Sequence, residues 1–352
     1  MLAPISCCRY ALADMRGTAI RHFDCCSQEE GVGIDITALL LAGVAFVASI
    51  WLMVEGAEKL TESFLRISIT FGVSTFLLGY LLSGIDLENL AVGIAGAVGD
   101  MPSVALGTVI GSATFLLSFA VGATAVLVPL QSDTPRRLLV LTLLSPVPLA
   151  LLALDGTLSR VDGAILFAAS LVLIAYVVHT ARTHPLMKPN EHKIRKALRP
   201  RPKWWAPVLL IGATIAIIIG AEIFQWSVKE LLALLGWQAA WFGMIIVAAA
   251  VSFEEVPRML APARQGHAEI SVGNILGTVL FFVLFNAGLI AMIHPLAVEP
   301  AVLRFYWPAM MLALALIIVF LWRGRIARLE GGVLLALYFI YVGIAISGDL
   351  WP

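Results

Sequence analysis

The sequence predicts an all-α integral membrane protein of about ten transmembrane helices, arranged as two inverted repeats of five helices. Three observations predict this fold. Of the 352 residues, 60% are apolar and only 13% are charged, whereas soluble domains average about 45–50% apolar and about 25% charged residues. The chain also holds ten long apolar runs, and one stretch around Glu88 matches a later stretch around Glu254. This composition excludes a soluble enzyme, a disordered protein and a nucleic-acid-binding protein.

Each apolar run approaches the roughly 20 residues that a helix needs to cross a bilayer. The only long polar interruption is the basic segment 181–204, which separates a first five-helix repeat, 35–180, from a second, 205–352. The expected helices occupy 36–54, 70–98, 103–130, 137–154, 162–179, 205–226, 238–262, 269–293, 303–322 and 331–347.

The basic residues indicate the orientation, because loops rich in Lys and Arg stay on the cytoplasmic side. When successive connections are assigned to alternate sides, 17 of the 23 basic residues fall on the side of 181–204 and six on the other. We therefore expect a multi-pass protein of the plasma (cell) membrane, with 181–204 in the cytoplasm and both termini outside. The zero net charge gives no reason to expect a nucleic acid or another polyanion as partner.

The N-terminal segment 1–34 is expected to be a disordered leader. It contains no apolar run long enough for a signal peptide. Its paired cysteines leave metal binding, disulfides and lipidation open, although adjacent cysteines lack the CxxC spacing of common metal sites. No function is assigned to these cysteines, Cys7, Cys8, Cys25 and Cys26.

The two matching stretches align without gaps when Glu88 is placed on Glu254, and we call this the repeat alignment. Both stretches have the same layout: an acidic helix, a short break and a GxxxG motif, which is typical of close helix packing. Because the copies are five helices apart, an odd number, the second enters the membrane upside down. Inverted repeats are common in secondary transporters, whose sites lie near the bilayer midplane. The identical pairs are Glu88/Glu254, Ala95/Ala261, Ala97/Ala263, Gly107/Gly273, Gly111/Gly277 and Phe115/Phe281.

Four carboxylates lie inside the two acidic runs: Asp86 and Glu88 in the first, Glu254 and Glu255 in the second. An ionised carboxylate at a helix centre costs about 2.5–3.5 kcal/mol, so these must be protonated, paired, hydrated or bound to cations. Oxygen ligands suit hard cations, and these runs contain no His or Cys, so we expect sodium, calcium or protons and no organic cofactor. Neutral oxygens on the same helices belong to Ser83, Asn89, Thr108, Ser112, Thr114, Ser252, Asn274 and Thr278.

Arg258 follows Glu254 by four residues and Glu255 by three. At this spacing an acid and a base pair on one helix face. The side chain either forms a structural salt bridge, extends to the cytoplasmic surface, or takes the place of one bound cation. In the last case the site holds fewer ions than its carboxylates suggest.

Two stretches carry a family resemblance: SFEEVPR followed by GNILGT, and DLENLAV followed by GTVIGS. They resemble the calcium:cation antiporter superfamily, whose sodium/calcium exchangers carry two inverted repeats of the form G-T-S-x-P-E followed by G-N-x-x-G-S-N. In the second repeat, Glu255 falls on the cation-binding glutamate, Ser252 on the serine, Asn274 on the Asn and Thr278 on the second serine. In the first, Asn89 falls on that glutamate, Asp86 on the serine, Thr108 on the Asn and Ser112 on the second serine.

The resemblance spans about 36–347 and implies a transporter, not an enzyme, whose ligands are inorganic cations. The proline of the motif is replaced by Glu88 and by Glu254. We expect alternating-access exchange of one small cation against protons or another cation, rather than exchange of several sodium ions for calcium. The expected cation ligands are Asp86, Glu88, Asn89, Ser112, Ser252, Glu254, Glu255, Asn274 and Thr278, with Arg258 as a modulating residue.

Two alternatives stay open. The first is a non-transporting relative whose site is neutralised by Arg258 and which acts as a sensor or partner subunit. The second is an intramembrane hydrolase with paired carboxylates, which the mixed Asp/Glu set disfavours. The sequence indicates neither the oligomeric state, the stoichiometry nor the organism.

Overall fold

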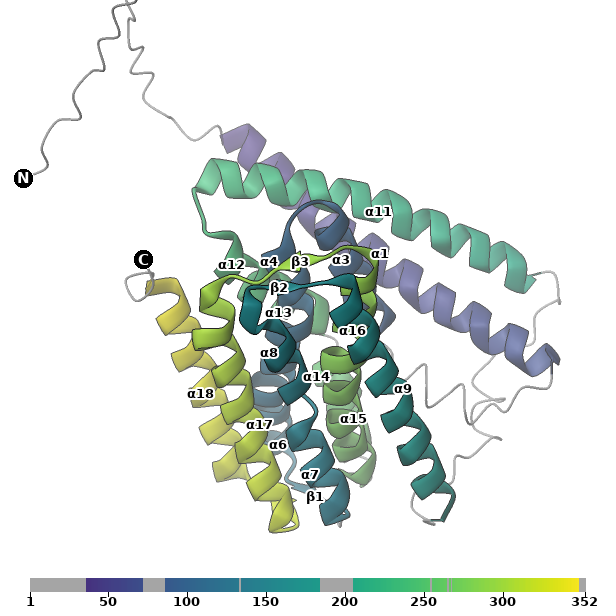
Figure 1. Ribbon diagram of the computed structural model, residues 1–352, viewed down its shortest axis with the longest axis vertical. Coiled ribbons are helices and arrows are strands. Elements are labelled where there is room, and N and C mark those ends of the chain that lie inside the picture. The colour runs from purple at the N-terminus through teal and green to yellow at the C-terminus, as the bar shows by residue number, and fades with distance from the viewer. Residues whose placement is uncertain are drawn as a thin grey trace, which may run out of the picture. The chain divides into compact units, whose positions relative to one another are not determined.

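The computed structural model describes residues 36–71, 86–132, 134–183, 205–253, 255–264, 266 and 268–347, and they are almost entirely helical (Figure 1). The leader with its four cysteines and most of the basic loop lie outside these residues, as does Glu254.

The first half contains α1 (Ile36–Phe71), α3 (Leu87–Val98), α4 (Pro102–Leu106), η1 (Gly107–Gly111), α5 (Ser112–Thr114), η2 (Phe115–Ala120), α6 (Val121–Leu127), β1 (Leu130–Gln131), α7 (Arg136–Leu144), α8 (Val147–Leu152), η3 (Ala153–Asp155), β2 (Thr157–Leu158) and α9 (Arg160–Thr183).

The second half begins after the basic loop. Its elements are α11 (Trp205–Leu235), α12 (Ala239–Trp241), η5 (Phe242–Val247), α13 (Ala248–Ser252), α14 (Glu255–Arg264), α15 (Ala268–Leu280), η6 (Phe281–Asn286), α16 (Ala287–Ile293), β3 (Leu296–Ala297), η7 (Val302–Tyr306), α17 (Trp307–Trp322), β4 (Arg325–Ile326) and α18 (Arg328–Ser347). The segments η1, η2, η5, η6 and η7 are π-helical turns inside longer helices, a feature frequent at functional sites.

Seven stretches of the described residues are long and apolar enough to cross a membrane, and each coincides with an expected run. Shorter apolar helices at Leu87–Val98 and Ala239–Ser252 fall within two further expected runs, and α9 covers the remaining one. Two expected helix ends are wrong: the helix expected to end at 54 continues to Phe71, and the helix expected to end at 226 continues to Leu235. The seven stretches are Ile36–Gly56, Pro102–Leu127, Arg136–Asp155, Pro207–Leu235, Ser271–Ile293, Val302–Trp322 and Arg328–Ser347.

Helices α4 to α6 and α15 to α16 form the interior of the bundle. In the stretch Pro102–Leu127, 94% of the apolar segment is buried, whereas in Pro207–Leu235 only 17% is buried. Leu116 and Phe282 are fully buried members of the main apolar cluster. The outer helices are apolar on their exposed faces, as expected where the surrounding solvent is lipid rather than water.

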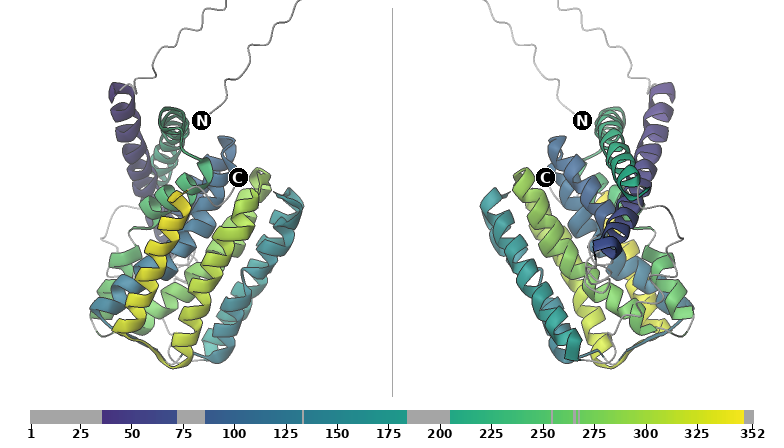
Figure 2. Two further views of the ribbon diagram at one scale, coloured as in Figure 1. Left: turned by 90° about the vertical axis from the view of Figure 1, so that its left-hand side faces the viewer. Right: turned by 90° about the vertical axis from the view of Figure 1, so that its right-hand side faces the viewer.

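Helices α1 and α11 run side by side, as both views in Figure 2 show. Gly56 of α1 lies against Ala213 and Ile217, and Gly220 of α11 lies against Met53, so the two helices are antiparallel. The pair packs on α3, α4 and α13 through its own apolar cluster, which includes Phe46, Phe224 and Phe242.

Two short antiparallel ribbons connect loops that are distant in sequence. Leu130 pairs with Ile326 where β1 meets β4, and Leu158 pairs with Leu296 where β2 meets β3. Each ribbon joins one loop of the first half to one loop of the second. When the repeat alignment is continued beyond the acidic stretches, β1 falls on β3.

Two glycine contacts bring outer helices against inner ones. Gly122 of α6 meets the backbone of Gly331 of α18, and Gly288 of α16 meets that of Gly163 of α9. A Cβ built on any of these glycines lies within 3 Å of a backbone atom across the contact. Gly122 and Gly288 also fall on each other in the repeat alignment, and small residues at such positions let membrane helices approach closely.

The neighbouring glycines of α18 give a matched test of this packing. A Cβ on Gly331 would lie 2.8 Å from the carbonyl oxygen of Gly122 and 2.9 Å from the Cβ of Ala125, whereas a Cβ on Gly332 meets no described atom within 4 Å. Gly331→Ala should therefore destabilise the protein by about 1–3 kcal/mol through overpacking. Gly332→Ala should be neutral or slightly stabilising, because alanine favours helix. Thermal unfolding in detergent measures both, and equal Tm values for the two variants would contradict this packing.

Candidate functional site

The site begins at a helix terminus. Asp86 is the N-cap of α3, and its Oδ1 accepts hydrogen bonds from the backbone N–H groups of Glu88 (3.1 Å) and Asn89 (3.0 Å). These N–H groups have no partner within the helix itself, and the positive end of the helix dipole favours a carboxylate there. The expected continuous run 70–98 therefore contains a helix start at Leu87, and Asp86 is held in a fixed position at it.

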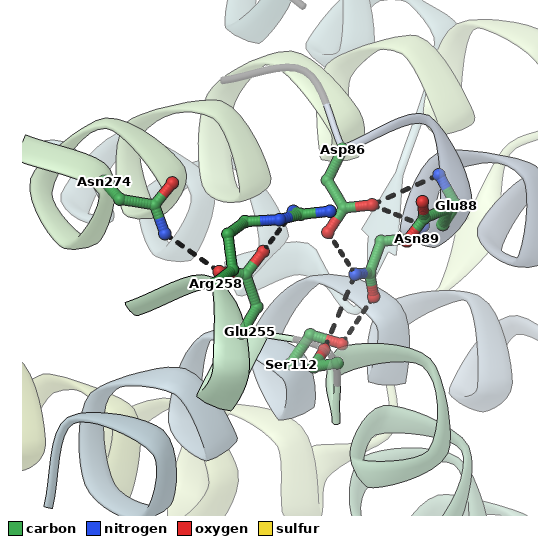
Figure 3. Close-up of polar contacts among 8 residues, drawn as sticks. Asp86, Glu88, Asn89, Ser112, Glu255, Arg258 and Asn274 are labelled. Carbon is green, nitrogen blue, oxygen red and sulfur yellow. Dashed lines mark hydrogen bonds and ion pairs between the residues drawn. The ribbon is translucent and has the colours of Figure 1, made fainter. Parts of the chain in front are cut away.

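Asn89 connects the two halves of the chain at the centre of the site (Figure 3). Its Nδ2 donates to Oδ2 of Asp86 at 2.6 Å and lies 3.5 Å from Oγ of Ser252, while its Oδ1 accepts from Oγ of Ser112 at 2.6 Å. Asn89, Ser112 and Ser252 are all fully buried. Because Ser252 belongs to the second half of the chain, this amide brings the ends of α3 and α13 together.

Glu255 is the corresponding position of the second half. It is the first residue of α14 and is only 1% exposed. Its Oε1 accepts from Nη1 of Arg258 at 2.7 Å and its Oε2 accepts from Nδ2 of Asn274 at 2.9 Å. The expected run 238–262 is broken here, since α13 ends at Ser252. A helix thus begins at the site within each of the two acidic stretches.

The remaining predicted ligands are less closely connected. Glu88 lies on the first turn of α3 and is buried. Thr278 is buried on α15, one turn after Asn274, and Glu254 lies outside the described residues. Within the described part of the chain, no three His, Cys, Asp or Glu side chains are grouped so that they could hold one metal ion. The arrangement is a mixed set of carboxylate, amide and hydroxyl oxygens.

The two GxxxG motifs have different surroundings. A Cβ on Gly107 would lie 2.2 Å from the carbonyl oxygen of Gly243, and one on Gly111 would lie 2.4 Å from that of Met244. Close packing is therefore confirmed for the first motif. For Gly273 and Gly277, no described atom lies within 4 Å of a built Cβ. Among the described residues, the second motif therefore makes no close helix contact.

One buried amide, Asn286, lies outside the residues predicted for the site. Asn286 ends the π-helical turn η6 and is 0% exposed, and neither its Nδ2 nor its Oδ1 has a hydrogen-bond partner in the described part of the chain. Such a group costs about 1–3 kcal/mol unless it finds a partner. The signal was a single amide in the apolar stretch FFVLFNAGLIAMI. Asn286 is thus a further candidate for contact with water or an ion.

Comparison with known proteins identifies the family. A model of the family described as "Sodium/calcium exchanger protein" matches residues 41–179 and 205–347. The chain belongs to this family. Inner membrane protein YrbG of Escherichia coli is 27% identical to this exchanger-family protein over 318 residues, which are 86% of this chain and 98% of YrbG. Sodium/calcium exchanger MaX1 of Methanosarcina acetivorans is 24% identical over 343 residues, 86% of this chain and 96% of MaX1.

A solved structure shares the fold of this exchanger-family protein. The sodium-calcium exchanger NCX_Mj, soaked with 100 mM Na⁺ and 10 mM Sr²⁺, superposes with a TM-score of 0.56 at 22% identity, covering 89% of this chain and 100% of that one. The resemblance to the calcium:cation antiporter superfamily is therefore confirmed. The family is one of membrane cation antiporters rather than enzymes.

Asn89 and Asn286 are both fully buried amides, so the same substitution tests what each contributes. Asn89→Leu removes the partner of Asp86 and Ser112 and should destabilise the protein by at least about 2 kcal/mol, because buried polar groups lose their hydrogen bonds. Asn286→Leu removes no described hydrogen bond and should be neutral or stabilising. Tm values in detergent measure the difference. A larger loss of stability in Asn286→Leu would show that Asn286 is a structural residue and remove it as a candidate.

Proposed function

We propose that this protein exchanges a small inorganic cation, sodium or calcium, against protons or another cation. The observation that carries the proposal is the buried polar cluster in which Asn89 joins Asp86, at the start of α3, to Ser252, at the end of α13. Glu255, at the start of α14, follows Ser252 by three residues. Hard cations prefer such oxygen ligands. The names of relatives agree with this chemistry: MaX1 is called a sodium/calcium exchanger, and NCX_Mj was soaked with Na⁺ and Sr²⁺.

The proposed cation ligands are the nine oxygen-bearing residues predicted from the sequence, of which Glu254 lies outside the described residues. Asn89 and Asn274 each use Nδ2 to bind a carboxylate. The amide oxygen of Asn89 also accepts from Ser112, but an amide oxygen has two lone pairs and can bind a cation with the second. In this proposal the cation binds among carboxylate, amide and hydroxyl oxygens. The set is Asp86, Glu88, Asn89, Ser112, Ser252, Glu254, Glu255, Asn274 and Thr278.

We further propose that the chain consists of two inverted five-helix repeats, 35–180 and 205–352, that alternate in giving access to the site. Support comes from contacts that recur in the two halves, with one partner of each contact at a position matched by the repeat alignment. Gly122 contacts α18 and Gly288 contacts α9, and β1 pairs with β4 as β3 pairs with β2. Transporters built in this way bind substrate where the repeats meet.

The charges of the site favour a small number of ions. Asn89 is neutral where the related position of the second half carries Glu255, and Arg258 neutralises one carboxylate. Fewer net negative charges hold fewer cations. This favours one cation exchanged against protons, which carboxylates in an apolar interior bind readily, over exchange of several sodium ions for calcium.

The proposed location is the plasma membrane. The relative YrbG is called an inner membrane protein, and the distribution of Lys and Arg favours a cytoplasmic loop at 181–204 with both termini outside. Single cysteines introduced into a variant without the four native cysteines test the orientation. In intact cells, an impermeant maleimide should label a cysteine at the C-terminus and fail to label one in 181–204; the reverse pattern would invert the proposed topology.

Transport is tested in proteoliposomes that carry an outward gradient of Na⁺ or of protons, with uptake of radioactive Ca²⁺ or Na⁺ as the measurement. Glu255→Gln should abolish gradient-driven uptake, because it removes a buried carboxylate of the proposed site. Glu222→Gln on the outer helix α11, where the side chain is exposed, is the matched control and should leave uptake unchanged. Uptake that does not depend on Glu255, or no uptake by the native protein under any gradient, would refute the proposal.

The ion pair between Arg258 and Glu255 supports a second candidate function. If the guanidinium neutralises the site permanently, the protein is a non-transporting relative that acts as a sensor or partner subunit. Calorimetry with Na⁺ and Ca²⁺ separates the two functions, since a permanently neutralised site binds neither ion.

A further inference from the structure

The ion pair of α14 joins a buried anion to a cation at the protein surface. Glu255 is 1% exposed, whereas the side chain of Arg258 is 41% exposed. A buried carboxylate is costly to keep charged unless a positive partner compensates it. In this conformation the guanidinium supplies that compensation through the 2.7 Å contact to Oε1.

The two partners differ in how freely they can move. The carboxylate of Glu255 is fixed from both sides, because its backbone starts α14 and its Oε2 is bound by Asn274 of α15. Arg258 has a long flexible side chain that reaches the surface, and such side chains change rotamer without moving the helix. In Figure 3 the guanidinium extends from Glu255 towards Asp86, across the middle of the cluster. A cation bound to Glu255 would therefore have to compete with a mobile charge for a fixed one.

Building on the cation exchange proposed above, we infer that Arg258 is a tethered counter-ion. It occupies the position of one bound cation at Glu255, so that an entering cation must displace it. Arg258 thereby weakens cation binding and determines which cation the site accepts. A purely structural salt bridge has the opposite effect, since its removal would loosen the site and weaken cation binding.

Selectivity follows from Coulomb's law. The guanidinium repels a divalent cation twice as strongly as a monovalent one at the same distance. Arg258 should therefore disfavour Ca²⁺ more than Na⁺. Its removal should shift the preference of the site towards divalent cations.

The experiment is calorimetric binding of Ca²⁺ and of Na⁺ to the purified full-length protein in detergent. Arg258→Gln should tighten Ca²⁺ binding by about tenfold or more, which corresponds to about 1.4 kcal/mol, and Na⁺ binding by a smaller factor. Arg258→Lys keeps the charge and should stay close to the native affinities. The matched control is Arg264→Gln, because Arg264 is an exposed arginine in the last turn of the same helix.

A double variant keeps the test decisive if Arg258→Gln leaves Glu255 uncompensated and unstable. Glu255→Gln with Arg258→Gln removes both charges, so it should fold and should lose the gain in Ca²⁺ affinity. If Arg258→Gln binds Ca²⁺ as weakly as the native protein or more weakly, the inference is overturned. The same holds if the gain persists in the double variant, or if the double variant alone folds and still binds Ca²⁺ more tightly than the native protein.

The outcomes also separate this inference from the proposed transport. A native protein that transports cations, with unchanged affinities in Arg258→Gln, overturns the tethered counter-ion alone. A native protein that binds no cation, with binding gained in Arg258→Gln, supports the tethered counter-ion and overturns transport. If neither protein binds any cation, both proposals fail.

Discussion

A carboxylate inside an apolar helix bundle needs hydrogen-bond donors, and this requirement shapes the backbone around the site. In the middle of a helix all main-chain N–H groups are already used, so only a helix start can supply them. Asp86 receives two such groups from the start of α3, and Glu255 stands at the start of α14. At Asp86 the helix interruption and the placement of the acid are therefore one feature, because an uninterrupted helix would leave this carboxylate without main-chain donors. Glu255 accepts from the side chains of Arg258 and Asn274.

Most of the helices could be predicted from the sequence, whereas the interruptions could not. Hydropathy is averaged over a window as long as a membrane-spanning helix, and the run that contains Asp86 is apolar on both sides of it. Nothing in such an average distinguishes an acid inside a helix from an acid that begins one. The extension of α11 to Leu235 was missed for a related reason: Glu222 and Lys229 lower the local hydropathy without ending the helix.

The site could be predicted in part because motif positions carry information about residue identity but little about partners. The alignment of motifs placed Asn89 and Asn274 among the ligands, and both lie in the cluster. That Asn89 reaches Ser252, in the other half of the chain, depends on the fold alone. The glycine motifs make the same point, since Gly107 has a close backbone neighbour and Gly273 has none among the described residues.

The two ribbons have a consequence for the order of synthesis. Leu130 cannot pair until Ile326 has been synthesised, and Leu158 cannot pair until Leu296 has been synthesised. The edges of β1 and β2 therefore stay unpaired until most of the second half has left the ribosome. The face of α6 around Gly122 is likewise uncovered until α18 arrives. Contacts between residues so far apart in sequence form late because long loops must close first. The first half is therefore inserted as an incomplete structure, and the contacts of β1 and of Gly122 form only when β4 and α18 are in place.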